Sequence, residues 1–151
     1  MDWKDLYDDK NKLKVPLRSS LAENKKVLNI LFDNCGDVVQ KSFAMERAEG
    51  MVYMHVIYID GLTNNEMIEE TILKPLSYEW RGNSARDVWD SILYREVQTA
   101  DIVEETSFDK MVGSILKGDT AILIDGYARA MIVSSKKLPL RGISENDTEA
   151  G

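Results

Sequence analysis

The sequence predicts a mixed α/β (α+β) protein made of two small packed α/β lobes, each a short sheet with covering helices. Apolar residues recur at helical spacing in some segments and alternate, or run continuously, in others. A polar, glycine-bearing stretch at residues 77–84 separates an α-β-β-α pattern from an α-β-α-β-β pattern. We therefore predict a flexible arm at residues 1–18, a first lobe at 19–78, a second lobe at 79–135 and an exit segment at 136–151.

Composition and charge are typical of a soluble globular protein. Of the 151 residues, 44% are hydrophobic and 30% are charged, and the net charge is −7. The densest basic groups are pairs such as Lys25-Lys26, so this acidic chain disfavours nucleic acid as a partner. No apolar run reaches the roughly 18–20 residues of a membrane span, and the charged first residues do not read as a signal peptide.

The first helix follows a polar arm that lacks a convincing period. Residues 20–23, Ser-Leu-Ala-Glu, form a capping-box pattern in which the Ser20 hydroxyl accepts from the Glu23 amide. Gly36 supplies the stop. One helical face is apolar and contains Leu21, Leu28, Leu31, Phe32 and Cys35. On this pattern Cys35 is interpreted as a small core residue rather than a nucleophile.

Two strands and a second helix complete the first predicted lobe. Residues 38–46 and 51–59 read as strands joined by a short turn, and the second is apolar on both faces, which suits an interior strand. A second capping box at residues 63–66 opens a helix that Pro75 closes.

The second lobe begins with a helix whose apolar positions are offset by 3, 4, 7 and 8 residues, namely Ala85, Val88, Trp89, Ile92 and Leu93. A short strand at residues 100–104 follows, and then a helix from Ser107 that ends at Gly118. Two last strands flank Asp125-Gly126, which reads as a tight hairpin turn. If the first two strands of this lobe are parallel neighbours, we expect a right-handed crossover between them.

The tripeptide Ile-Asp-Gly closes two apolar runs, at Asp60-Gly61 and at Asp125-Gly126. The first leads into a capped helix and the second into a strand, so we interpret both primarily as turns and regard an internal repeat as weakly supported. An alternative is that Asp60 and Asp125 lie at adjacent strand ends and form the lip of a pocket. That alternative predicts a ligand-binding cleft between the lobes, with Asp60, Gly61, Asp125, Gly126 and Tyr127 as candidate residues.

Catalytic and metal-binding patterns are not found in the sequence. The single histidine, His55, lies within an apolar strand and is interpreted as structural, because a Ser-His-Asp arrangement needs a base oriented by a carboxylate. One His, one Cys and scattered carboxylates give no zinc-ligand spacing, and the nine glycines form no phosphate loop. We predict no enzymatic activity, no metal and no cofactor.

Three motifs in order resemble a known family. They are YIDGLTNNEMIEETILKPL at residues 58–76, SFDKMVGSILKGDTAILIDGYARAMIV at 107–133, and RGISENDTEA at 141–150. From about Leu28 onward the chain is similar to the amino-terminal soluble domain of the A subunit of GerA-type spore germinant receptors. Asn146 stands where this family usually has proline, and the chain stops at Gly151, where family members continue toward a membrane region. We therefore expect a fragment cut ahead of that region.

The resemblance implies a role in nutrient-triggered spore germination. Such receptors lie in the inner spore membrane and combine the A subunit with a transporter-like B subunit and a lipoprotein C subunit, and this domain would face the spore core. The expected role is signal transmission and receptor assembly, with Arg141, Glu145 and Glu149 coupling the domain to the membrane region and with homo-oligomers in the intact receptor. The alternative role is recognition of a small nutrient, such as an amino acid or a sugar, in the cleft between the lobes.

Overall fold

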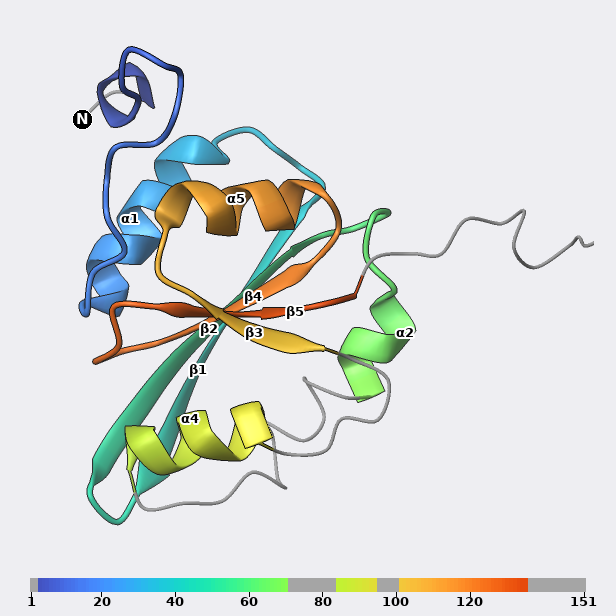
Figure 1. Cartoon of the computed structure of the whole chain (residues 1–151). Coiled ribbons are helices and arrows are strands. Elements are labelled where there is room, and N and C mark those ends of the chain that lie inside the picture. Colours follow the sequence, from blue (N-terminus) through green and yellow to red (C-terminus); the bar gives the residue numbers. More distant parts are fainter. Residues whose placement is uncertain (1–2, 71–83, 95–100, 136–151) are drawn as a thin grey trace, which may run out of the picture.

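The computed structural model describes residues 3–70, 84–94 and 101–135. Its centre is one five-stranded sheet in the order β1-β2-β4-β5-β3, and every neighbouring pair is antiparallel (Figure 1). The strands are β1 (Val38–Arg47), β2 (Gly50–Ile59), β3 (Ile102–Glu105), β4 (Thr120–Ile124) and β5 (Ala130–Val133).

Helices cover both faces of the sheet, so the molecule has three layers (Figure 1). One face packs against α1 (Leu21–Leu31) and α5 (Phe108–Leu116), and the other packs against α2 (Asn65–Ile68) and α4 (Ala85–Tyr94). The alternation of side chains along β2 divides the core, because Ile57 points to the α1 and α5 side while Val56 points to the α4 side.

The two predicted lobes share this single sheet, which corrects the expectation of two short sheets. Strand β2 from the first half pairs directly with β4 from the second, in the register Met54↔Ile124 and Ile57↔Ala121. A strand that is apolar on both faces is most stable between two neighbours, and β2 finds its second neighbour far along the chain. The predicted boundary at residues 78 and 79, most of the 77–84 linker and the 136–151 exit segment lie outside the described residues.

The mixed α/β class and the order of elements agree with the sequence pattern. The condition for the expected crossover, that the first two strands of the second lobe are neighbours, is not met. Strands β3 and β4 are separated by β5, which pairs with both of them. The connection through α5 therefore spans one intervening strand.

The predicted flexible arm is packed onto the molecule at residues 3–18, which is a further correction. After a short 3₁₀ helix, η1 (Trp3–Leu6), the chain buries Leu6, Leu13 and Leu17 in the core cluster formed with α1 and α5. The Leu13 amide also donates to Asp109 Oδ1 of α5 at 2.9 Å. The leucines of this segment do not form one face of a regular element, so the sequence shows no period here. They pack instead against a helix that lies about a hundred residues away in the chain.

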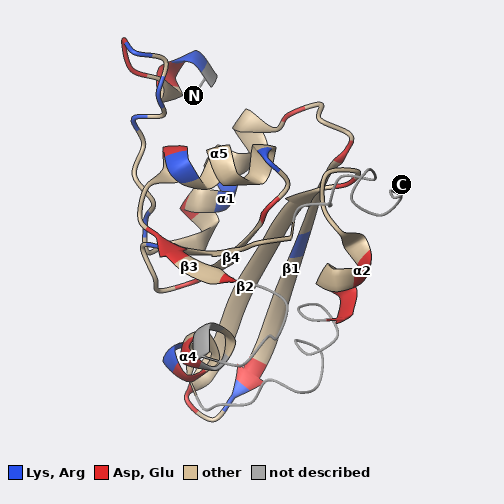
Figure 2. Ribbon diagram, turned by 45° about the vertical axis from the view of Figure 1, so that its right-hand side comes forward, with Lys and Arg blue, Asp and Glu red and all other residues tan. Residues whose placement is uncertain are grey.

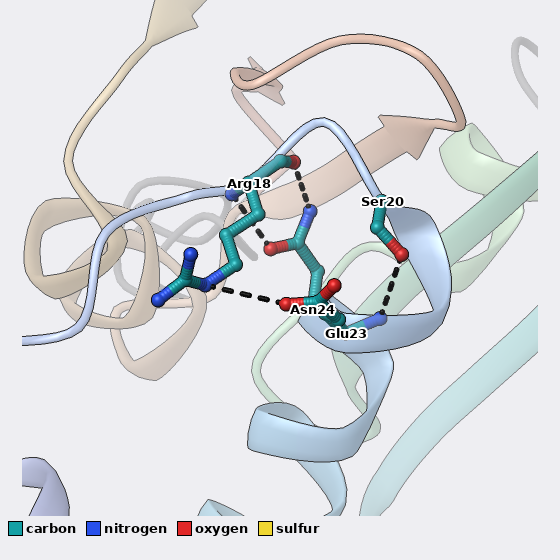
Figure 3. A network of polar contacts seen from close by, with 4 residues as sticks. All are labelled: Arg18, Ser20, Glu23 and Asn24. Carbon is teal, nitrogen blue, oxygen red and sulfur yellow. Dashed lines mark hydrogen bonds and ion pairs between the residues drawn. The ribbon is translucent and has the colours of Figure 1, made fainter.

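Polar contacts join the end of this N-terminal segment to the first turn of α1 (Figure 3). The Asn24 side chain accepts from the Arg18 amide at 2.9 Å and donates to the Arg18 carbonyl at 2.8 Å. Ser20 Oγ accepts from the Glu23 amide at 3.3 Å, which confirms the predicted N-cap. Arg18 and Glu23 also form an exposed ion pair at 3.4 Å, which adds little stability in water.

Local signals at helix ends were mostly accurate, with two exceptions. Ser107 caps α5 as predicted, but the N-cap of α2 is Asn64 rather than Thr63, and its side chain accepts from the Met67 amide at 3.1 Å. Helix α1 ends at Leu31, so Cys35 leaves the apolar face and is an exposed free cysteine rather than a core residue.

Candidate functional site

The loop between β4 and β5 contains the second Ile-Asp-Gly motif and spans residues 125–129, so it is longer than the predicted tight turn. The Asp125 amide donates to the Tyr53 carbonyl at 2.9 Å, and Asp125 Oδ1 accepts from the Leu21 amide at 2.9 Å. The Gly126 amide donates to the Ser19 carbonyl at 2.8 Å, in a backbone conformation with φ +102° that favours glycine. Asp125 and Gly126 thus attach this loop to the start of α1.

A groove of about 440 Å³ opens beside this loop, between the loop, α4 and β3. Tyr127 lies over the buried Trp89 of α4, with ring centroids 4.6 Å apart and planes 3° from parallel. The lining of the groove is mainly polar and consists of Arg86, Trp89, Asp90, Glu104, Gly126, Tyr127, Ala128 and Arg129.

Charges of both signs surround the groove, at the start of α4 and on the acidic strand β3 (Figure 2). Arg129 Nη1 lies 3.0 Å from Glu104 Oε1, and Arg86 Nε lies 3.8 Å from Asp90 Oδ2. Burial raises the pKa of the Tyr127 hydroxyl above the ordinary tyrosine value, which is itself high enough to keep this hydrogen-bond donor neutral at neutral pH. The groove can offer an aromatic ring, hydrogen-bond donors and both signs of charge to a small polar molecule.

The first Ile-Asp-Gly motif lies at the other end of strand β2. Asp125 contacts Tyr53, whereas Asp60 is seven positions further along the strand, roughly 20 Å away at the rise of an extended chain. Asp60 Oδ1 accepts from the Asn65 side chain at 2.7 Å, and Gly61 has φ +93° in the turn that leads to α2. The described residues therefore do not bring Asp60 and Gly61 together with Asp125, Gly126 and Tyr127.

Other predicted functional residues fall into two groups. Arg141, Glu145 and Glu149 lie outside the described residues. His55 is held in a polar network beneath α1, where Nδ1 contacts Ser42 Oγ at 2.8 Å and Nε2 contacts Gln40 Oε1 at 2.7 Å.

This environment supports the structural interpretation of His55. Burial, with a smaller contribution from the Lys25 charge, lowers the pKa of His55 from 6.5 to about 4. The neutral ring donates from Nε2 to the side-chain oxygen Oε1 of Gln40, and it accepts at Nδ1 from the Ser42 hydroxyl. Both ring nitrogens are therefore satisfied, as a buried histidine requires.

Little in the sequence indicates the groove residues that lie on other elements. Trp89 was assigned to the apolar stripe of a helix, which is correct, but its stacking with Tyr127 depends on a loop almost forty positions away. Arg86 and Arg129 read as ordinary exposed charges. Only Gly126 and Tyr127 were predicted as members of a site.

Within residues 3–70, 84–94 and 101–135, no helix combines the length and the apolar character needed to cross a membrane. In the same ranges, no three His, Cys, Asp or Glu side chains gather in a group suited to a metal ion.

Comparison with known families identifies the class of protein. The family model described as Bacillus/Clostridium GerA spore germination protein matches residues 26–151. The chain belongs to this family, which confirms the resemblance found in its motifs. It is a family of receptor proteins rather than of enzymes.

Individual relatives agree with this assignment. The spore germination protein GerLA of Bacillus cereus is 32% identical over 94 residues, or 62% of this chain and 19% of the relative. The membrane protein YfkQ of Bacillus subtilis (strain 168) is 26% identical over 147 residues, or 97% of this chain and 27% of the relative. The chain thus spans about a fifth to a quarter of these relatives' lengths.

A solved structure shares the fold. The crystal structure of the N-terminal domain of the A subunit of the Bacillus megaterium spore germinant receptor GerK3 superposes with a TM-score of 0.69 at 20% identity. The match covers 82% of this chain and 49% of that one.

Proposed function

We propose that this chain acts in nutrient-triggered spore germination as a domain of a receptor A subunit, where it transmits a signal and supports receptor assembly. The observation that carries the proposal is the family match, which begins within α1 and continues to residue 151. The fold shared with the N-terminal domain of a germinant receptor A subunit supports it.

The place of β5 in the sheet suits a transmitting domain. Strand β5 is buried at all four positions and pairs with β4 on one side and β3 on the other. The chain that follows residue 135 therefore continues from the interior of the sheet rather than from an edge. A displacement of that following chain acts on the strands and helices packed around β5.

The partners and location follow from the same proposal. We expect the domain to work with B and C subunits at the inner spore membrane, on the side of the spore core, and to reach the membrane through chain beyond the described residues. Self-association within the intact receptor belongs to this proposal as well.

A deletion tests the proposed role. Spores would express the receptor without residues 26–135, and the measurements would be membrane levels of the partner subunits and the fall in optical density after nutrient addition. We expect both the partner levels and the response to decrease. Leu116→Ala serves as a control because this side chain is 56% exposed. Full assembly and a full nutrient response after the deletion would refute the proposal.

A second candidate function is recognition of a small polar ligand, and the groove beside Tyr127 favours it. The groove replaces the cleft predicted between Asp60 and Asp125, since Asp60 follows the last residue of β2 whereas Asp125 lies beside Tyr53, seven positions earlier. Its donors, acceptors and aromatic ring suit a molecule with hydroxyl groups or with both charges, which includes sugars and amino acids.

Titration of the chain with amino acids and sugars, followed by amide NMR shifts, tests this second function. Saturable shifts at residues 126–129, with none at Asp60 and Gly61, are the expected result. Glu104→Gln, which removes one charge from the groove, should weaken the shifts. Shifts centred on Asp60, or no shifts at millimolar ligand, would contradict binding in this groove.

A further inference from the structure

A buried polar cluster lies where the described chain ends after β5. Thr63 is 1% exposed, Thr120 is fully buried and Ser135 is 2% exposed. Their hydroxyl groups gather around the backbone carbonyl of Gly118. We call Thr63, Gly118, Thr120 and Ser135 the exit joint.

The hydrogen bonds of the exit joint have one consistent direction. The Gly118 carbonyl accepts from Thr63 Oγ1 at 2.9 Å and from Ser135 Oγ at 3.1 Å. Because the Ser135 proton is used in that bond, the 2.8 Å contact between Thr120 Oγ1 and Ser135 Oγ has Thr120 as its donor. The Ser135 carbonyl also accepts from the Asn64 amide at 2.7 Å.

Three parts of the fold meet at the exit joint. Thr63 and Asn64 belong to the connection between β2 and α2, and Gly118 belongs to the turn between α5 and β4. Ser135 follows β5 by two residues and is the last residue described before the exit segment. Ser135 is therefore hydrogen-bonded both to the connection that precedes α2 and to the turn that follows α5.

Because these groups are buried, breaking one of the hydrogen bonds without replacing it is costly. A hydroxyl or carbonyl left unpaired in the interior costs about 1–3 kcal/mol, so the cluster favours either the complete arrangement or a distinctly different one. Asp119, next to Gly118, adds a related feature, because its Oδ1 atom is buried and has no hydrogen-bond partner among the described residues. Asp119 thus places an unpaired acceptor next to the exit joint.

We propose that the exit joint couples the chain beyond residue 135 to the receptor domain, with Thr63, Thr120 and Ser135 as its positioning residues. The inference rests on the proposed signalling function and names the residues through which the signal passes. It also gives a role to two motifs of the sequence, since Thr63 follows the first Ile-Asp-Gly-Leu and Gly118 opens Gly-Asp-Thr. From the sequence alone, Thr63 is predicted to open a helix as part of a capping box and Gly118 to end one.

The test uses isosteric loss of single hydroxyl groups in the receptor as the spore expresses it. Thr63→Val and Ser135→Ala remove a donor, whereas Thr63→Ser keeps one. Matched controls are Thr106→Val and Ser134→Ala, at exposed positions outside the joint. The measurements are the receptor level in the membrane and the nutrient concentration that gives a half-maximal response.

We expect Thr63→Val and Ser135→Ala to raise that concentration by about five-fold or more at an unchanged receptor level, as loss of a typical coupling free energy does. Thr63→Ser and both controls should respond normally. A normal response in Thr63→Val and Ser135→Ala would overturn the coupling role, and so would a loss of response fully explained by a lower receptor level.

The domain deletion described above separates this inference from the proposed function. If the deletion leaves the nutrient response intact, the proposed function itself fails. If the deletion abolishes the response while the joint variants respond normally at normal receptor levels, only the exit joint is wrong.

Discussion

Replacement of Leu6 by alanine tests whether the N-terminal segment is part of the folded core. Leu6 has no exposed surface and packs in the cluster shared by α1 and α5. A flexible arm, as the sequence alone predicts for residues 1–18, would make this substitution neutral. The packed segment in the structure makes it costly.

The expected size follows from burial. Removing a fully buried leucine side chain to alanine costs about 2–5 kcal/mol, from lost transfer free energy and the cavity that remains. Each kcal/mol lowers the melting midpoint of a chain of this size by about 2–4 °C, so the midpoint should fall by at least about 4 °C. Leu116→Ala is the matched control, because its side chain is 56% exposed and lies on the solvent side of α5.

Thermal unfolding followed by circular dichroism at 222 nm measures both variants against the parent chain. A decrease for Leu6→Ala well beyond that for Leu116→Ala is the expected result. If the free energies of unfolding of the two variants differ by less than about 1 kcal/mol, the N-terminal segment does not contribute to the core and our account of residues 3–18 is wrong.

Four further substitutions test individual residues. Because the folded His55 is neutral while the unfolded one binds a proton between pH 6.5 and its folded pKa of about 4, stability should fall by up to about 3 kcal/mol as the pH decreases through that window. His55→Gln should remove this part of the pH dependence in urea unfolding. Gly126→Val should destabilise by on the order of 1 kcal/mol or more, because φ is +102°, although no atom lies within 4 Å of the added Cβ. Gly113→Ala, within α5, should instead stabilise by up to about 1 kcal/mol, and equal melting midpoints for the two glycine variants would contradict this. Asp125→Ala removes the acceptor of the Leu21 amide and should cost about 1 kcal/mol in the same melting assay, and a neutral result would show that this contact contributes nothing.

Local structure could be predicted because its signals lie close together in the sequence. Ser20 and Ser107 cap their helices by bonds to amides three positions later, and the run ending at Ile59 forms an interior strand. At α2 the predicted cap was wrong by one residue, because Asn64 and not Thr63 is the N-cap. Thr63 is instead directed to Gly118, more than fifty positions away.

The arrangement of the strands could not be predicted in the same way. A strand pattern states which faces are buried but not which other strand is its neighbour, so β2 and β4 were placed in separate sheets. The contacts of the N-terminal leucines with α5 could not be predicted from the sequence for the same reason. The candidate groove also depends on long-range packing, since Trp89 and Tyr127 meet only when α4 covers the sheet.

The order of strands in the sheet has a consequence for how the protein is made. Among the described strands, β3 pairs with β5 and β2 obtains its second neighbour from β4. The β2 and β4 pairing can therefore form only after residue 124 has been synthesised, and the β3 and β5 pairing only after residue 133. At typical synthesis rates of about 5–20 residues per second, the β1 and β2 hairpin exists for several seconds with an apolar edge unpaired. An unpaired edge of this kind attracts other chains. The nascent chain is therefore most vulnerable to aggregation in this interval, and we expect the need for chaperones to end once β5 has joined the sheet.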